Sequence, residues 1–369
     1  MKIQAIELRR VSVPLITPFR TSFGVEPDRD AVMVRVITAD ADGWGECVSG
    51  SEPFYCSEYA DGSWKVLEEH ILPLLLSAGD AIDGLSVERI LKPIHGHRMS
   101  KAAVEIAVLD AQTRAAGRSL QSFLGGTREL VETGVSVGIH DEIDALLATV
   151  SGYVADGYTR IKLKVEPGND IEHVRAVHDL VGGRVRLQVD ANCAYTRGDI
   201  QHLCRFDEFD LLLIEQPFEV DDLVSHAELR KLSSTPVCLD ESIESLHILD
   251  TAIALGAVDV VNIKPGRIGG WIEAKRIHDR CVEAGLLLWH GGMLETGIGR
   301  AANVALASLP GFTLPGDLSA SDRYFHQDLT EKFVLENGFL RVPTTPGIGR
   351  EPLPEMLARF TKRVATIRP

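Results

Sequence analysis

Five short apolar segments of this chain end in a charged residue at nearly constant intervals. The steps from Lys164 to Asp190, Glu215, Asp240 and Lys264 are 26, 25, 25 and 24 residues. A strand followed by a helix needs about this length, so each charged residue occupies the same place in a repeated βα unit. That place is the C-terminal end of the strand, where barrel enzymes build their active sites.

Strand-like apolar stretches alternate with longer amphipathic stretches from about residue 133 onward. Such alternation is typical of βαβ units and a parallel sheet. About eight units in a row favour a closed (β/α)8-type barrel, although an open doubly wound sheet would give the same local pattern. The predicted strands are Gly134–Val137, Arg160–Val165, Arg186–Asp190, Leu211–Glu215, Val237–Asp240, Asp259–Lys264, Leu286–Trp289 and Phe312–Leu314.

The first 125 residues have a different character and indicate an α+β region. Strand-like alternation runs through Ile3–Val13 and Ala31–Thr38, and a turn-rich segment, Ala41–Gly45, follows. Apolar residues then recur at helical spacing from Val104 to Ala115. We therefore expect two regions of unequal type, because 369 residues exceed one ordinary domain.

The composition excludes several classes of protein. A hydrophobic content of 45% is enough for a folded core, and a net charge of −15 argues against general nucleic-acid binding, which needs a basic face. Apolar runs such as Ile71–Leu76 are far shorter than the roughly 20 residues that span a bilayer. The N-terminus has no signal-peptide core, and the six cysteines show no C-x-x-C spacing. We expect a reduced, cytoplasmic protein without membrane or nucleic-acid partners.

Strand alternation places charged side chains inside the predicted barrel. In the segment Ile161–Lys164 both lysines share one face and the apolar residues share the other. Outward faces of barrel strands are covered by helices and should be apolar, so Lys162 and Lys164 point inward. The same argument sends Asn262 and Lys264 inward. Buried charges at equivalent places in successive strands must compensate one another or bind an ion.

The three carboxylates Asp190, Glu215 and Asp240 form a candidate metal site. Oxygen ligands without His or Cys suit Mg²⁺ or Mn²⁺ rather than zinc. Asp240 and Glu241 are neighbours and cannot both face inward. Alternation with an inward Cys238 selects Asp240 as the ligand and leaves Glu241 to support the ligands.

The lysines are candidates for acid/base chemistry. Lys162 and Lys164 lie on the second predicted strand and Lys264 on the sixth, which face each other across an eight-stranded ring. Burial and neighbouring cations lower a lysine pKa and make a neutral amine available as a base. The matching reaction removes a proton α to the carboxylate of a small molecule, with a metal ion stabilising the resulting enediolate.

The motifs around these residues resemble the enolase superfamily, muconate lactonizing subgroup. A narrower resemblance, to o-succinylbenzoate synthases and N-acylamino acid (N-succinylamino acid) racemases, comes from Gly291–Pro310 and Leu314–Tyr324. The resemblance covers almost the whole chain, including Pro18–Gly24, which is similar to the lid of the family's capping domain. The superfamily motifs are K-x-K at Lys162 and Lys164, VDAN (Val189–Asn192), IEQP (Ile214–Pro217), LDES (Leu239–Ser242) and NIKPGRIGG (Asn262–Gly270).

The resemblance implies a fold, a domain division and residue roles. The fold would be α/β, a modified TIM-type barrel, (β/α)7β, with an α+β capping domain at 1–125, a barrel at 126–325 and a C-terminal segment, 326–369, that returns to the capping domain. Lys164 and Lys264 would be the acid/base pair, Lys162 would support them, and the three carboxylates would hold Mg²⁺, for which Mn²⁺ or other divalent ions could substitute. Further ligand-orienting or substrate contacts would be Asn192, Glu241, Ser136, Gly292, Met293, Arg20 and Ser319.

The implied activity is that of o-succinylbenzoate synthase, the syn dehydration of 2-succinyl-6-hydroxy-2,4-cyclohexadiene-1-carboxylate in menaquinone biosynthesis, together with racemisation of N-acyl or N-succinyl amino acids. A dedicated N-succinylamino acid racemase is the alternative, because one intermediate serves both reactions. Family habit further implies a homo-oligomer. The family often has Cys where this chain has His290, so His290 is either a substrate contact or an altered wall.

Other classes are weaker alternatives. Dipeptide epimerases usually carry D-x-D near the last strand, where this chain has Asp317 and Ser319. A non-catalytic barrel should have lost a lysine or a carboxylate, and none is lost. A Schiff-base enzyme would not need three carboxylates. Gly297–Ala302 matches a degenerate dinucleotide motif, but it follows the seventh strand and should form a tight turn into a helix.

Overall fold

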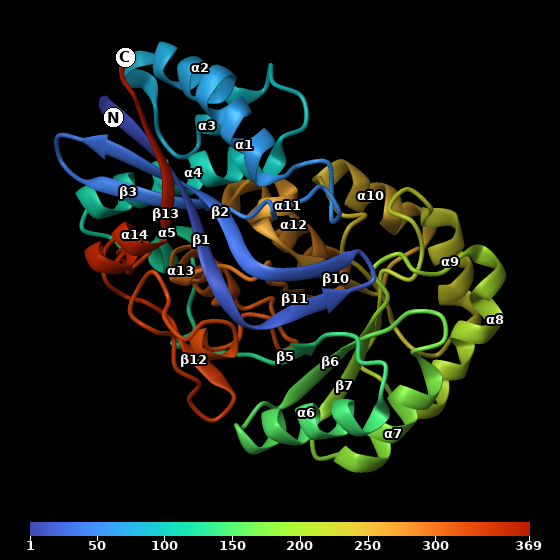
Figure 1. Ribbon diagram of the computed structural model, residues 1–369. Helices are drawn as coiled ribbons and strands as arrows, with labels where there is room; N and C mark the ends of the chain where they lie inside the picture. The colour runs from blue at the N-terminus through green and yellow to red at the C-terminus, as the bar shows by residue number, and fades with distance from the viewer.

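The computed structural model describes residues 1–369, apart from the side chain of Ala81. An antiparallel sheet in the order β13-β1-β2-β3 forms the N-terminal part, and the last strand pairs with the first, Ile6 opposite Ile367. The two ends of the chain therefore meet on this sheet (Figure 1). Its strands are β1 (Ile3–Thr21), β2 (Gly24–Thr38), β3 (Asp42–Cys47) and β13 (Thr361–Ile367).

Helices cover one face of this sheet, and α4 lies directly on β3. Gly43 and Gly45 permit this approach, because a Cβ at either would collide with the backbone of α4 at Ala107 or Ala103. The turn that we predicted at 41–45 is therefore wrong, since these glycines belong to a strand packed under a helix. The helices are α1 (Ala60–Val66), α2 (Leu72–Ser77), α3 (Val87–Leu91), α4 (Arg98–Ala115) and α5 (Leu120–Leu124), with a π-helical turn, Leu67–Ile71, between α1 and α2.

A curled parallel sheet follows, with helices on its outer side (Figure 1). In the described chain it has seven strands: β5 (Val135–Val137), β6 (Arg160–Lys164), β7 (Arg186–Asp190), β8 (Ile214–Glu215), β9 (Val237–Leu239), β10 (Val260–Ile263) and β11 (Leu287–His290). The helices that connect them are α6 (Ile143–Ala155), α7 (Ile171–Val181), α8 (Ile200–Leu203), α9 (Leu223–Leu232), α10 (Leu246–Leu255), α11 (Pro265–Ile268) and α12 (Trp271–Ala284), and α13 (Gly297–Ala307) follows β11. The predicted α/β barrel class is confirmed.

The eighth predicted strand, Phe312–Leu314, is not a strand in the structure. The segment 314–317 instead links the two edges of the parallel sheet by a few backbone hydrogen bonds on each side. Leu314 N donates to Leu288 O on β11 at 3.1 Å, and Gly134 N, just before β5, donates to Gly316 O at 2.7 Å. Proline at 315 cannot donate to a ladder, which explains why this closure is irregular.

The barrel interior has an apolar lower layer and a charged upper layer. Leu213, Cys238, Val260 and Trp289 are fully buried and pack together inside the sheet. Each belongs to the inward series that strand alternation predicts. A small sheet of β4 (Leu130–Glu132) and β12 (Phe339–Arg341), and helix α14 (Pro354–Phe360), complete the chain.

Candidate active site

A cavity of about 1000 Å³ lies where the N-terminal sheet meets the C-terminal ends of the parallel strands. Lys162, Lys164 and Lys264 line it from the barrel side. The hairpin between β1 and β2 lines it from the other side with Phe19, Thr21, Phe23 and Gly24. The segment predicted to act as a lid therefore does border the cavity.

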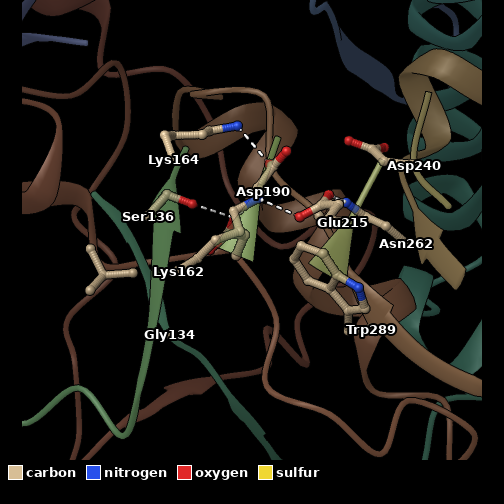
Figure 2. Close-up of polar contacts among 12 residues, drawn as sticks. Gly134, Ser136, Lys162, Lys164, Asp190, Glu215, Asp240, Asn262 and Trp289 are labelled. Atoms are coloured by element: carbon tan, nitrogen blue, oxygen red, sulfur yellow. Dashed lines mark hydrogen bonds and ion pairs between the residues drawn. The ribbon is translucent and has the colours of Figure 1, made fainter. Parts of the chain in front are cut away.

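Lysine ammonium groups of β6 lie close to the carboxylates at the ends of the next strands (Figure 2). Lys162 Nζ lies 3.0 Å from Asp190 Oδ2 and 3.1 Å from Glu215 Oε2. Lys164 Nζ lies 2.7 Å from the same oxygen of Asp190. Asn262 Nδ2 donates to Glu215 Oε1 at 2.7 Å. The inward orientation derived from alternation holds for all five side chains.

Lys264 closes the opposite side of this cluster. Its Nζ lies 2.6 Å from Asp240 Oδ2 and 3.4 Å from the hydroxyl of Tyr55, which follows β3 in the N-terminal region. Arg267, at 4% exposure, also pairs with Asp240. The Asp240 carboxylate is thus held by two cations from the segment that follows β10.

The pKa values of the lysines diverge. Burial lowers the pKa of Lys164 from its usual value. Burial alone would also lower the pKa of Lys264, but Tyr55, Glu241 and Glu215 around it raise that pKa above its usual range. The general expectation of a lowered lysine pKa therefore fits Lys164, whereas the carboxylates of Glu241 and Glu215 oppose it at Lys264.

The three carboxylates have the chemistry of a divalent-metal site. Asp190, Glu215 and Asp240 are buried, come from adjacent strands and offer only oxygen atoms, which are the ligands that hard cations prefer. Among the residues that the structure describes, no three His, Cys, Asp or Glu side chains converge closely enough to surround one ion. Lysine ammonium groups contact these oxygens instead, so a metal ion would replace those contacts.

Asn192 and Glu241 lie beside this cluster, as predicted. Lys164 Nζ donates to Asn192 Oδ1 at 2.5 Å, and Asn192 Nδ2 donates to Glu241 Oε1 at 2.9 Å. Asn192 also donates its backbone N–H to Asp190 Oδ1 at 3.0 Å. The amide therefore orients both the lysine and the aspartate.

A buried network below Lys162 was missed by the sequence reasoning. Asp317 lies 2.8 Å from Lys162 Nζ and 2.9 Å from Arg160 Nη1, and it accepts a hydrogen bond from Ser136 Oγ at 2.6 Å. The inward orientation of Arg160 could have been predicted, because Arg160 lies two residues before Lys162 on the same strand and therefore on the same face. Asp317 carried no such signal, since its segment lacks strand alternation.

The remaining predicted contacts divide into two groups. Ser136, Gly292 and Met293 line the cavity. Arg20 instead pairs through Nη1 with Asp141 at 2.9 Å, outside the lining. Ser319 is buried and donates to Gly134 O at 3.0 Å, so it braces the irregular closure of the barrel.

His290 follows the inward Trp289 and therefore faces the outer side of the sheet. Its ring lies 5.7 Å from that of Phe312, and it borders a separate hollow beside Arg128 and Leu314. Burial lowers the pKa of His290 to about 4, so the ring is neutral at pH 7. Of the two roles left open, this placement fits an altered wall rather than a substrate contact.

Comparison with known proteins agrees with this arrangement. Residues 5–125 match the family described as "Mandelate racemase / muconate lactonizing enzyme, N-terminal domain", and residues 145–356 match "Enolase C-terminal domain-like". The chain belongs to the mandelate racemase / muconate lactonizing enzyme family of the enolase superfamily. Enzymes of this kind generally use a divalent metal. No helix that the structure describes is long and apolar enough to cross a membrane.

Individual relatives narrow the family. An N-succinylamino acid racemase from Amycolatopsis sp. is 56% identical over 361 residues, 98% of each protein. An o-succinylbenzoate synthase from Geobacillus kaustophilus is 44% identical over 364 residues, 98% of this chain and 96% of that protein. A solved enolase-superfamily structure from Listeria innocua Clip11262 has a TM-score of 0.95 at 38% identity, covering 100% of this chain and 99% of its own.

Proposed function

We propose that this family member is an o-succinylbenzoate synthase that also racemises N-succinyl amino acids. The observation that carries the proposal is the pair Lys164 and Lys264, which line one cavity from the end of β6 and from the residue that follows β10. Two lysines placed on opposite sides of a substrate, one to accept a proton and one to donate a proton, are what α-proton removal and return require. Relatives with both names align along nearly the whole chain.

In the dehydration, Lys164 Nζ accepts the proton α to the substrate carboxylate. The same group then returns a proton to the departing hydroxide on that face of the ring. Lys264, as an ammonium ion, stabilises the enediolate charge between these steps. Asn192 holds Lys164 in place, and Lys162 contributes a fixed positive charge beneath the substrate.

In the racemisation, the two lysines work on opposite faces of the α-carbon. Lys164 accepts the α-proton of one enantiomer, and Lys264 delivers a proton to the other face. The reverse direction exchanges these roles. The two reactions share the first proton transfer, which is why one cavity can serve both.

We further propose that the divalent ion is Mg²⁺, held by Asp190, Glu215 and Asp240. When bound, it supplies positive charge that lowers the pKa of the substrate α-proton. The proposal predicts that EDTA abolishes α-proton exchange and that Mg²⁺, or Mn²⁺, restores it. Zinc should restore less, because the donor set has no nitrogen or sulfur.

A dedicated N-succinylamino acid racemase is the second candidate, favoured by the 56% identity to a relative of that name. A paired assay with Mg²⁺ distinguishes the two. One arm follows dehydration of the succinyl-hydroxycyclohexadiene carboxylate, and the other follows α-proton exchange of N-succinyl-phenylalanine in D₂O. Comparable kcat/KM in both arms supports the bifunctional enzyme.

Two results would change the conclusion. Fast exchange with little dehydration would establish the dedicated racemase. Neither activity with metal bound would reject both functions and direct attention to other reactions of the family. Lys164→Ala serves as the control protein in each arm, since it lacks the proposed base but keeps the carboxylates.

A further inference from the structure

The wall of the cavity next to Lys264 is a loop between β11 and α13, residues 291–296. Gly292, Met293 and Leu294 line the cavity with little side-chain polarity to anchor them. The loop ends at Thr296, the N-cap residue of α13. The position of this wall is therefore set by where α13 begins.

A carboxylate from the N-terminal sheet binds the start of α13. Glu46, on β3, is 2% exposed, and its Oε2 accepts from Thr296 Oγ1 at 2.7 Å and from Gly299 N at 3.0 Å. Thr296 N contacts Oε1 and Oε2 at 3.2 and 3.1 Å. Arg29 Nε, from the adjacent strand β2, lies 3.5 Å from Oε1. A residue 250 positions earlier in the chain thus helps to hold the start of α13, together with Asp328, whose Oδ1 accepts from Gly297 N at 2.8 Å.

The segment Gly297–Ala302, which matches a degenerate dinucleotide motif, lies against the carboxylate of Glu46. A Cβ on Gly299 would lie 2.9 Å from Glu46 Oε2, and a Cβ on Gly297 would collide with Thr330. The unpaired N–H groups at a helix N-terminus favour a negative charge. Here that charge is supplied from within the chain, which leaves no room for a phosphate.

Glu46 belongs to the region that also forms the lid over the cavity. Its partner Arg29 lines the cavity, as do Met293 and Leu294 at the other end of the contact. Glu46 therefore joins two walls of one cavity that belong to different parts of the chain. Neither wall contains the acid/base lysines.

We propose that Glu46 is a positioning residue for substrate binding, which sets the loop 291–296 against the lid through the N-terminus of α13. This inference rests on the proposed function, since it assigns the loop to contacts with the substrate. A contact made equally in the ground state and the transition state raises KM and leaves kcat unchanged when it is lost, and this is the pattern that we expect for a loop away from the acid/base lysines.

A matched control exists in the same region. Glu105, on α4, is 3% exposed and accepts a hydrogen bond from Ile272 N at the start of α12, at 3.0 Å. It too is a buried carboxylate of the N-terminal region at the N-terminus of a barrel helix. In the described chain, residues 269–272 do not line the cavity. A general weakening of the contact between the N-terminal region and the barrel would change KM in both variants. Displacement of the loop 291–296 would change KM only in the Glu46 variant.

The first test compares Glu46→Gln with Glu105→Gln. Both carboxylate oxygens of Glu46 accept hydrogen bonds from donors at the start of α13. In Glu46→Gln, an NH₂ group replaces one of these oxygens in either orientation of the amide, and it cannot accept a hydrogen bond from an N–H group. We expect KM for N-succinyl-phenylalanine to rise about tenfold, with kcat within about threefold of wild type. Glu105→Gln should leave KM unchanged. Equal KM changes in the two variants would overturn the proposal.

A second variant reaches the same contact from the other side. Gly299→Ala keeps Glu46 but places a methyl group 2.9 Å from its Oε2 and 2.8 Å from Cγ of Glu295 in the same loop, and should raise KM as Glu46→Gln does. The double variant should be little worse than either single variant, since both disrupt one contact. Fully additive effects would contradict the assignment.

Hydrogen–deuterium exchange gives a readout that needs no activity. Glu46→Gln should speed amide exchange within residues 291–299, and Glu105→Gln should leave exchange in that segment unchanged. Unchanged exchange at 291–299 would overturn the inference even if the enzyme is active. If wild type performs neither reaction, the proposed function fails, while this measurement still decides whether Glu46 holds the loop.

Discussion

Lys264 Nζ lies 3.4 Å from the hydroxyl oxygen of Tyr55 and 5.0 Å from the centre of its ring. Tyr55 belongs to the N-terminal region and Lys264 to the barrel, so one region of the chain covers a proposed acid/base group of the other. The ring of Phe23 packs edge-on against Tyr55 at 5.9 Å, which places the lid over the same point. The hairpin between β1 and β2 therefore contacts Lys264 through Tyr55.

This contact predicts the effect of changing Tyr55. Tyr55→Phe keeps the ring over the ammonium group and should lower kcat for racemisation by only about threefold. Tyr55→Leu removes the ring–cation attraction, worth about 0.5–2 kcal/mol, and should lower kcat by about tenfold or more. Steady-state kinetics of racemisation would give kcat for both variants. Phe54→Leu, which changes the exposed neighbouring ring, is the control, and an equal loss there would contradict the prediction.

The roles of Lys164 and Lys264 can be distinguished with pure enantiomers of the substrate. Lys164→Ala and Lys264→Ala should each lower racemisation by about 10²- to 10⁴-fold, the usual contribution of a general acid or base. Each variant should still exchange the α-proton of one enantiomer, because the other lysine remains on that face. Proton NMR of N-succinyl-D- and N-succinyl-L-phenylalanine in D₂O would show this. Loss of exchange with both enantiomers in either variant would argue against the two-face assignment.

The charged layer of the site was predictable because strand alternation is a local rule. A period of two residues sends Lys162 and Lys164 to one face, whatever the rest of the chain does. The constant step between strand ends then brings Asp190 and Glu215 beside them. Residue type, strand parity and spacing together were sufficient for this part.

Contacts between segments distant in the chain were not predictable in this way. Asp317 reaches Arg160 across 157 residues from a segment without strand alternation, and Glu46 reaches Thr296 across 250. Such pairs depend on how the sheets close and dock, which no local period encodes. The strand containing Glu46 was itself missed, because its glycines indicate a turn until α4 is seen to pack on them.

The ion pair between Asp317 and Arg160 predicts a large effect on stability. Although burial alone would raise it, Lys162 and Arg160 hold the pKa of Asp317 well below its usual range. Asp317→Asn would leave both cations without this buried countercharge, at a cost of about 3–5 kcal/mol in the free energy of unfolding. Ser136→Ala removes one hydrogen bond to Asp317 and should cost about 1 kcal/mol. Urea denaturation would give the free energy of unfolding of both variants. Similar decreases in the two variants would contradict the prediction.

Glu105 predicts how stability changes with pH. Burial raises its pKa to about 8 in the folded protein, from 4.5 for an exposed glutamate. Between these values the folded protein keeps a proton that the unfolded chain has lost. The contribution of Glu105 to the free energy of unfolding is therefore fully present below about pH 4.5 and is lost as the pH rises through 8.

Glu105→Gln imitates the protonated form and cannot titrate. Relative to wild type, the variant should become progressively more stable from pH 5 to pH 9. Thermal unfolding at pH 5, 7 and 9 measures the difference, with Glu283→Gln on the exposed side of α12 as a control whose difference should stay flat. A Glu105→Gln difference that is the same at pH 5 and pH 9 would show that this carboxyl is already ionised in the folded protein. The burial of Glu105 against α12 would then have to be compensated by the backbone N–H groups of Ile272 and Trp271 and by the charge of Arg276, all of which lower its pKa.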